Sequence, residues 1–326
     1  MNRDGFRPAW WLPGPHAQTL GARWLRSRNG ENALRRERIP LPDGDFLDLD
    51  FSDVDPRLPL VVVLHGLEGS ARSTYALQMY RALRARDIQA VGLNFRSCSG
   101  ELNQSSRLYH SGETGDLAYV LSLLRRRFPA RVIGAVGFSL GGNVLLKYLG
   151  EVLPPLRPVV KAAVAISVPF DLAAGARWLE RGFSRAYRRY LVRKLQRKTR
   201  AKAALLRHRI SVERVLAART FVEFDDAATA PLHGFRDAQD YYARSSCAQY
   251  LGAIRVPTLL IHSADDPFLP PEAIPRAAVV GNSMLRAEFT ETGGHVGFVS
   301  GPPWAPVLWA EQRAARFLAE QLSRET

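Results

Sequence analysis

The pentapeptide Gly137-Phe138-Ser139-Leu140-Gly141 contains a serine flanked by glycines two positions away on either side. This spacing matches Gly-x-Ser-x-Gly, a sharp strand-to-helix turn that holds a serine hydroxyl clear of a sheet. The apolar run at 132–136 predicts a buried strand before the turn, and apolar residues recur at helical spacing after it. We therefore expect Ser139 to be a nucleophile. The alternative is a glycine-rich turn without chemistry.

An acid and a histidine follow two later predicted strands. Asp266 comes after the strand expected at 255–262, and His295 comes after the strand expected at 284–290. The carboxyl ends of parallel strands meet at one edge of a sheet, so we expect both side chains to reach Ser139. In that arrangement Ser139 attacks an acyl carbonyl, His295 moves its proton, and Asp266 fixes the imidazole tautomer. Asp265 is the competing acid; we choose Asp266, which directly precedes a proline, and expect Asp265 to brace the loop.

The loop after the predicted buried strand at 60–64 is His65-Gly66-Leu67. It also falls at the carboxyl end of a strand, and its backbone is suited to an oxyanion hole. We expect the N–H groups of Leu67 and Leu140 to bind the oxyanion, because the residue after the nucleophile and a second loop supply these donors. The alternative is a strand-ending turn in which His65 packs locally.

The order serine, aspartate, histidine and the alternation of strands and helices predict an α/β-hydrolase fold, with a mostly parallel central sheet flanked by helices. After the strand expected at 159–168 this alternation stops, and helical patterns fill the chain to residue 250. We divide the chain into a first part of the core at 1–170, a helical cap insertion at 171–250 and a second part of the core at 251–326. We also expect an extended arm with buried aromatics at 8–20, a half-buried hairpin at 36–39 and 46–51, and a C-terminal helix at 304–323.

Composition limits the remaining possibilities. The 326 residues are 46% hydrophobic, which allows a large core, and the two cysteines, Cys98 and Cys247, do not suggest a disulfide framework. No apolar signal segment or bilayer-length run is visible, so we expect a cytoplasmic protein. The seven histidines lack metal-ligand spacing and no phosphate-binding loop follows a strand, so we expect no metal and no cofactor. Cys98 has no assignable base, and we expect a spectator thiol.

The net charge of +14 is concentrated in one segment. Residues 176–220 carry fifteen Arg or Lys and two acids, Glu180 and Glu213. A solvated cap helix explains this best, and the alternatives are steering of anionic substrates or contact with an anionic membrane surface. We expect no nucleic-acid partner, because no recognised nucleic-acid motif is present and the charge is confined to the insertion.

Several longer motifs resemble one branch of the α/β-hydrolases, the bacterial YheT-like esterases related to the eukaryotic ABHD1/2/3 proteins. The matching stretches lie at 8–19 (Pro-Ala-Trp-Trp-Leu-Pro-Gly-Pro-His-Ala-Gln-Thr), 65–70, 94–100, 109–114, 137–143, 231–235, 265–268 and 293–298 (Gly-Gly-His-Val-Gly-Phe). The resemblance implies a carboxylic-ester hydrolase acting on short- to medium-chain acyl esters or lipids, with Ser139, Asp266 and His295 as its triad. Ser97 stands where this family usually has glycine.

Other function classes stay open at this point. A thioesterase or amidase would use the same triad, because the elbow does not distinguish acyl substrates. A non-catalytic scaffold with this fold is a further alternative, which the intact set of three residues disfavours.

Overall fold

The centre of the protein is an eight-stranded sheet. The structure is a computed structural model that describes residues 5–27, 33–52, 55, 57–152 and 158–323. Strands β1 and β2 pair antiparallel, β2 pairs antiparallel with β4, and the remaining neighbours are parallel. The mostly parallel sheet predicted from the sequence is confirmed. In sheet order the strands are β1 (Arg35–Pro40), β2 (Phe46–Phe51), β4 (Gln89–Asn94), β3 (Leu60–Leu64), β5 (Ile133–Phe138), β6 (Ala162–Ile166), β7 (Thr258–Ser263) and β8 (Leu285–Thr290).

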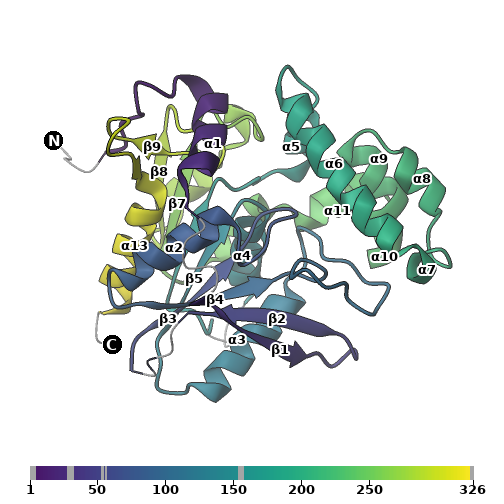
Figure 1. Ribbon diagram of the computed structural model, residues 1–326, viewed down its shortest axis with the longest axis horizontal. Coiled ribbons are helices and arrows are strands. Elements are labelled where there is room, and N and C mark those ends of the chain that lie inside the picture. The colour runs from purple at the N-terminus through teal and green to yellow at the C-terminus, as the bar shows by residue number, and fades with distance from the viewer. Residues whose placement is uncertain (1–4, 28–32, 53–54, 56, 153–157, 324–326) are drawn as a thin grey trace.

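Helices cover both faces of this sheet (Figure 1). Successive side chains of a strand point to opposite faces, so Val62 packs into one apolar core and Val61 and Val63 into the other. The first core includes residues of α3 (Gly115–Arg127) and α4 (Leu140–Glu151), and the second includes residues of α2 (Thr74–Arg84) and α13 (Trp309–Leu322). Burial on both faces explains why the sequence of β3 is a continuous run of apolar residues.

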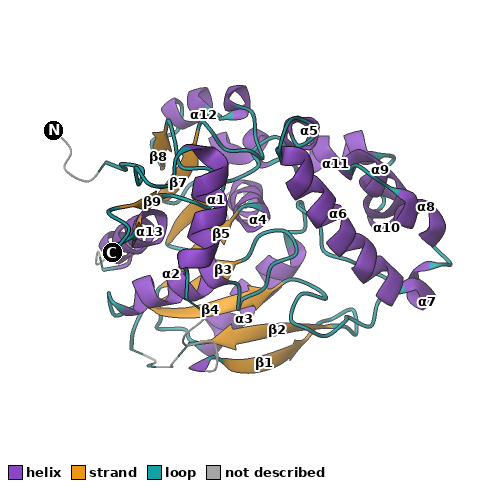
Figure 2. Cartoon of the chain, turned by 45° about the horizontal axis from the view of Figure 1, so that its top comes forward, coloured by secondary structure: helices purple, strands orange, loops and turns teal. Residues whose placement is uncertain are grey.

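The chain between β6 and β7 folds into a group of helices beside the sheet (Figures 1 and 2). Part of this group has an apolar cluster of its own, which includes Leu206, Val215 and Phe224 and takes Leu108 from the core. Its elements are α5 (Leu172–Trp178), α6 (Ser184–Ala201), α7 (Ala203–Leu206), α8 (Val212–Ala217), α9 (Phe221–Phe224), a π-helical turn (Asp225–Thr229), α10 (Ala230–His233), α11 (Ala238–Ser245) and a 3-10 helix (Cys247–Ala253).

The prediction that residues 8–20 form an extended arm is wrong. Residues Gly14–Leu25 form helix α1, with Pro15 in its first turn, where the fixed φ of proline suits a helix start. Trp10 is 76% exposed, so the aromatics of this segment are not all buried. Trp11 is partly buried and donates a hydrogen bond from Nε1 to the carbonyl oxygen of Gly301 at 2.9 Å.

Smaller differences concern the edges of elements. Every residue of β2 is buried, against the expected alternation, because Asp48 and Asp50 form ion pairs with arginines instead of facing water. The strand expected at 159–168 is shorter, and the C-terminal helix expected at 304–323 begins only at Trp309. A short strand, β10 (Val307–Leu308), precedes α13 and pairs with β9 (Val299–Ser300). The remaining helices are a 3-10 turn (Pro271–Ala273) and α12 (Arg276–Val280), and each described helix is too short or too polar to span a bilayer.

Candidate active site

Ser139 lies on a strained turn between β5 and α4. Its φ of 51° and ψ of −119° are rare for a residue with a side chain, and such strain concentrates at functional sites. The turn is possible only with glycines beside it. A Cβ on Gly137 would lie 2.4 Å from the carbonyl oxygen of Gly141, and one on Gly141 would lie 2.6 Å from that of His65. These contacts explain the glycine spacing that identified the serine.

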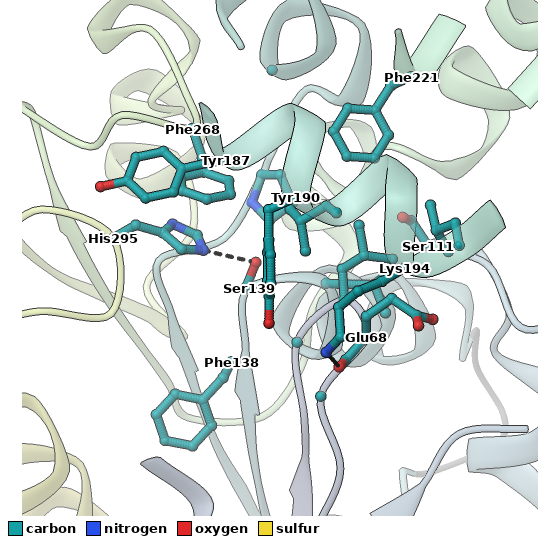
Figure 3. Close-up of a pocket in the computed structure, with 18 of the residues that line it drawn as sticks. Glu68, Ser111, Phe138, Ser139, Tyr187, Tyr190, Lys194, Phe221, Phe268 and His295 are labelled. Atoms are coloured by element: carbon teal, nitrogen blue, oxygen red, sulfur yellow. Dashed lines mark hydrogen bonds between the residues drawn. The ribbon is translucent and has the colours of Figure 1, made fainter. Parts of the chain in front are cut away.

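The structure brings together the three residues selected from the sequence, and two of them, Ser139 and His295, are seen in Figure 3. The Nε2 atom of His295 lies 3.0 Å from the Oγ atom of Ser139, and its Nδ1 atom lies 2.9 Å from the Oδ2 atom of Asp266. Asp266 is 2% exposed. Asp265 accepts a hydrogen bond from the backbone N–H of Gly294 at 2.8 Å, so it braces the loop before His295. In this geometry His295 Nδ1 donates to the carboxylate while Nε2 faces the hydroxyl.

Other parts of the chain hold the imidazole of His295 in place. The ring of Phe268 stacks on it at a centroid distance of 3.9 Å and an interplanar angle of 18°. The backbone N–H of His295 donates to Oγ1 of Thr19 in α1 at 2.9 Å, and the next N–H, of Val296, donates to Oγ of Ser167 at 2.8 Å. Helix α1 therefore supports the site, a role that its sequence did not indicate.

A second histidine, His262, lies beside Asp266 and was not selected from the sequence. Its Nε2 atom is 3.9 Å from Oδ2 of Asp266, and neither ring nitrogen has a hydrogen-bond partner within the described residues. Burial lowers the pKa of His262 to about 4, so the ring is neutral at physiological pH. It is the last but one residue of an apolar strand, which in sequence looks like any strand-ending residue.

The proposed oxyanion donors both border the pocket that contains Ser139. Leu140 is the first residue of α4. Leu67 is also near the serine, because the preceding residue, Gly66, packs so closely that an added Cβ would be 3.2 Å from Cβ of Ser139. Neither amide N–H finds an acceptor in the described part of the chain. Both are therefore available to a ligand oxygen, as an oxyanion hole requires.

His65 packs locally and also shapes this loop. It is fully buried, its Nδ1–H donates to the carbonyl oxygen of Gly66 at 2.7 Å, and its Nε2 accepts the N–H of Phe95 at 3.1 Å. Burial lowers the pKa of His65 to about 3, so the ring stays neutral and keeps this tautomer. The local-packing interpretation of His65 and the oxyanion interpretation of the loop are compatible.

The pocket around Ser139 has a volume of about 860 Å³. Apolar and aromatic side chains of the insertion form much of its wall, with Tyr187, Tyr190 and Leu191 coming from α6. Cys98 also borders it and has Nζ of Lys198 at 3.2 Å from its Sγ, while burial raises the pKa of the thiol. A thiol kept protonated by burial is a poor nucleophile, in line with the role expected for Cys98.

Ser97, which replaces the usual glycine of the resembling family, adopts a φ of 60°. This is the left-handed conformation that glycine adopts without strain. The turn is held by Asn103, whose backbone N–H donates to Oγ of Ser97 at 3.0 Å and whose Oδ1 accepts the N–H of Ser97. Hydrogen bonds to Asn103 therefore hold Ser97 in a backbone conformation that favours glycine.

The sheet, the elbow and the three convergent residues define an α/β-hydrolase. The comparison of sequences agrees: residues 59–302 match the α/β hydrolase fold family, and the chain belongs to it.

Individual relatives place the chain among proteins named as esterases and lipases. The Escherichia coli protein named "Putative esterase YheT" is 40% identical over 95% of this chain and 92% of its own length. Phospholipase ABHD3 of Bos taurus is 30% identical over 95% of this chain and 75% of its own length. Among solved structures, an esterase of Pyrococcus furiosus superposes with a TM-score of 0.60 at 18% identity, over 90% of this chain and 94% of that one, which supports the fold. The predicted resemblance to YheT-like proteins is confirmed.

Proposed function

We propose that this protein is a serine hydrolase that cleaves carboxylic esters through an acyl-enzyme on Ser139. His295 removes the hydroxyl proton as Ser139 attacks the acyl carbonyl, and then protonates the leaving alcohol. Water, deprotonated by the same imidazole, releases the acid. Asp266 orients and stabilises the imidazolium. The N–H groups of Leu67 and Leu140 bind the oxyanion, each contributing on the order of 3 kcal/mol to the transition state.

One observation carries this proposal: the Ser139 to His295 to Asp266 hydrogen-bond chain, with contacts of 3.0 and 2.9 Å, on a strained elbow. The strained backbone conformation of Ser139 costs free energy that the surrounding structure must offset. A scaffold without activity would gain nothing from that cost. The same triad would also cleave a thioester or an amide, so the leaving group has to be identified by assay.

The pocket supports short- to medium-chain acyl esters or lipids as substrates. A volume of about 860 Å³ with a largely apolar wall accommodates an acyl chain together with a leaving group. We propose that residues 171–250 are a cap that closes this pocket, because α5, α6 and α9 contribute wall residues while β5 and β7 lead to the reacting groups. The phospholipase name of the bovine relative is consistent with a lipid ester.

The test is hydrolysis of p-nitrophenyl esters from acetate to palmitate by the wild-type protein and Ser139→Ala. We expect the variant to lose at least about 10⁴-fold in kcat/KM, because removing the nucleophile of a triad costs that much or more. The acyl chain length that gives the highest kcat/KM indicates the size of the acyl pocket. Matched thioester and anilide substrates identify the leaving group, and a fluorophosphonate probe should label the wild type only. Equal rates for both proteins would contradict the proposal.

A further inference from the structure

Three lysines lie on one face of α6. The chain has forty arginines and only five lysines, yet Lys194, Lys198 and Lys202 follow one another at intervals of four residues along this helix and its C-cap. Residues at this spacing share a helix face. All three amines reach the core of the protein. The ammonium group of lysine is a compact point charge, whereas the guanidinium of arginine is planar and larger.

Two of these lysines bind Glu68, the residue directly after the proposed oxyanion donor Leu67. The Nζ atom of Lys194 donates to the backbone carbonyl oxygen of Glu68 at 2.8 Å, and Nζ of Lys198 donates to its Oε1 at 2.6 Å. The Glu68 and Lys198 side chains are 7% and 10% exposed, so water does little to weaken this ion pair. Figure 3 shows Lys194 and Glu68 in contact within the pocket that contains Ser139.

The rest of Glu68 is held as well. Its backbone N–H donates to the hydroxyl oxygen of Tyr109 at 2.8 Å, and that hydroxyl donates to Oε1 of Glu68 at 2.9 Å. The φ of Glu68 is 54°, a conformation that costs energy for a residue with a side chain. A strained residue whose N–H, C=O and carboxylate are all bound is held by its surroundings. Two of the four contacts come from α6.

We propose that Lys194 and Lys198 are positioning residues that hold the loop at 65–69 so that the N–H of Leu67 faces the oxyanion. The helical insertion then completes the oxyanion hole as well as covering the pocket. This inference rests on the proposed function, because it assigns a role only if an oxyanion forms at Ser139. Donors that point in advance to the developing charge stabilise the transition state more than the ground state. Loss of the lysines should therefore lower kcat and leave KM nearly unchanged.

The test compares Lys194→Met and Lys198→Met with the matched control Lys202→Met. Lys202 comes from the same helix face, but its amine binds the carbonyl oxygens of Ser105 and Arg107 and not the oxyanion loop. All three changes keep an unbranched side chain and remove the contacts that the ammonium group makes between the insertion and the core. We expect kcat for p-nitrophenyl butyrate to fall about tenfold to a hundredfold in the first two variants, with KM within about threefold of wild type. Lys202→Met should retain kcat.

A second readout separates oxyanion binding from general loosening of the cap. An alkylboronic acid forms a tetrahedral adduct on the serine, so its Ki should rise in parallel with the loss of kcat. The Ki of the corresponding neutral alcohol, which does not use the oxyanion hole, should stay constant. Lys198→Arg retains the positive charge and should recover part of the lost kcat. Lys194→Gln, which keeps an amide donor, serves if Lys194→Met does not fold.

Three results would overturn the inference: similar losses in all three methionine variants, an effect confined to KM, or boronate affinity that does not follow kcat. Failure of the proposed function looks different. In that case the wild type and Ser139→Ala hydrolyse the ester at the same rate, and the boronate binds neither of them.

Discussion

Replacing Asp266 by asparagine tests the whole site, because the structure fixes how the new amide must lie. The backbone N–H of Phe268 donates to Oδ1 of Asp266 at 2.8 Å, so the amide oxygen must stay at that position. The NH₂ group then occupies the place of Oδ2, 2.9 Å from Nδ1 of His295. An NH₂ donor facing Nδ1 makes Nδ1 the acceptor and moves the ring proton to Nε2. In that tautomer Nε2 no longer accepts the proton of Ser139.

We expect Asp266→Asn to lower kcat about 10⁴-fold, equivalent to about 5 kcal/mol of transition-state stabilisation. KM should change little, since the carboxylate is buried behind the imidazole and does not line the pocket. The assay is steady-state hydrolysis of a p-nitrophenyl ester, with urea unfolding to show that the variant is folded.

Asp265→Asn is the matched control. Asp265 accepts the N–H of Gly294, and an amide oxygen accepts it equally well, so the loss should be at most about tenfold. If Asp266→Asn kept activity within tenfold of wild type, or if Asp265→Asn were the more damaging change, the reasoning from the hydrogen-bond chain would be refuted.

Three further changes test the fold and the surface. Gly141→Ala puts a Cβ 2.6 Å from the carbonyl oxygen of His65, so urea denaturation should show a loss of about 2–4 kcal/mol, and an unchanged midpoint would contradict the packing. The pKa of His262 is lowered to about 4, so the unfolded chain binds more protons than the folded one between pH 6.5 and 4. Stability is then lost as the pH falls through this window, by up to about 1.4 kcal/mol per pH unit, and His262→Leu should show a shallower decline. Arg189 and Arg193 lie exposed on α6. If this face contacts membranes, binding to vesicles should rise with anionic lipid, fall with salt and weaken by about 1 kcal/mol for each arginine neutralised to Gln, and binding that is absent or independent of salt would contradict the idea.

Local chemistry made the framework of this protein predictable. Strands buried on both faces, such as β3, appear as apolar runs, and the elbow requires glycines that are visible in the sequence. The order of Ser139, Asp266 and His295 follows from the order of the strands that carry them. The prediction failed where local pattern and tertiary packing disagree. The half-buried pattern of β2 came from Asp48 and Asp50, which are buried because arginines of neighbouring segments pair with them.

The supporting residues of the site were not predictable for a related reason. Thr19, Lys194 and Lys198 lie far from Ser139, Leu67 and His295 in sequence, and their side chains meet the site only after the helices dock. No spacing rule links them to a strand end. A lysine that binds a backbone carbonyl looks in sequence like any other basic residue of a charged helix. The exception is composition: lysine is rare in this chain, and three of its five lysines share one helix face.

Lys194 and Lys198 connect the insertion to the loop at 65–69 of the core. Most basic residues of α6 are arginines, several of them exposed, and exposed charges tolerate exchange because they contribute little to stability. The lysines at 194 and 198 are more buried and each has a defined acceptor, so their amines are specified by geometry. If both bonds fail when the insertion moves away from the sheet, the loop at 65–69 loses two of its restraints at once. Under the proposed function, the insertion that lines the pocket therefore also supplies two of the restraints that hold the proposed oxyanion donor Leu67.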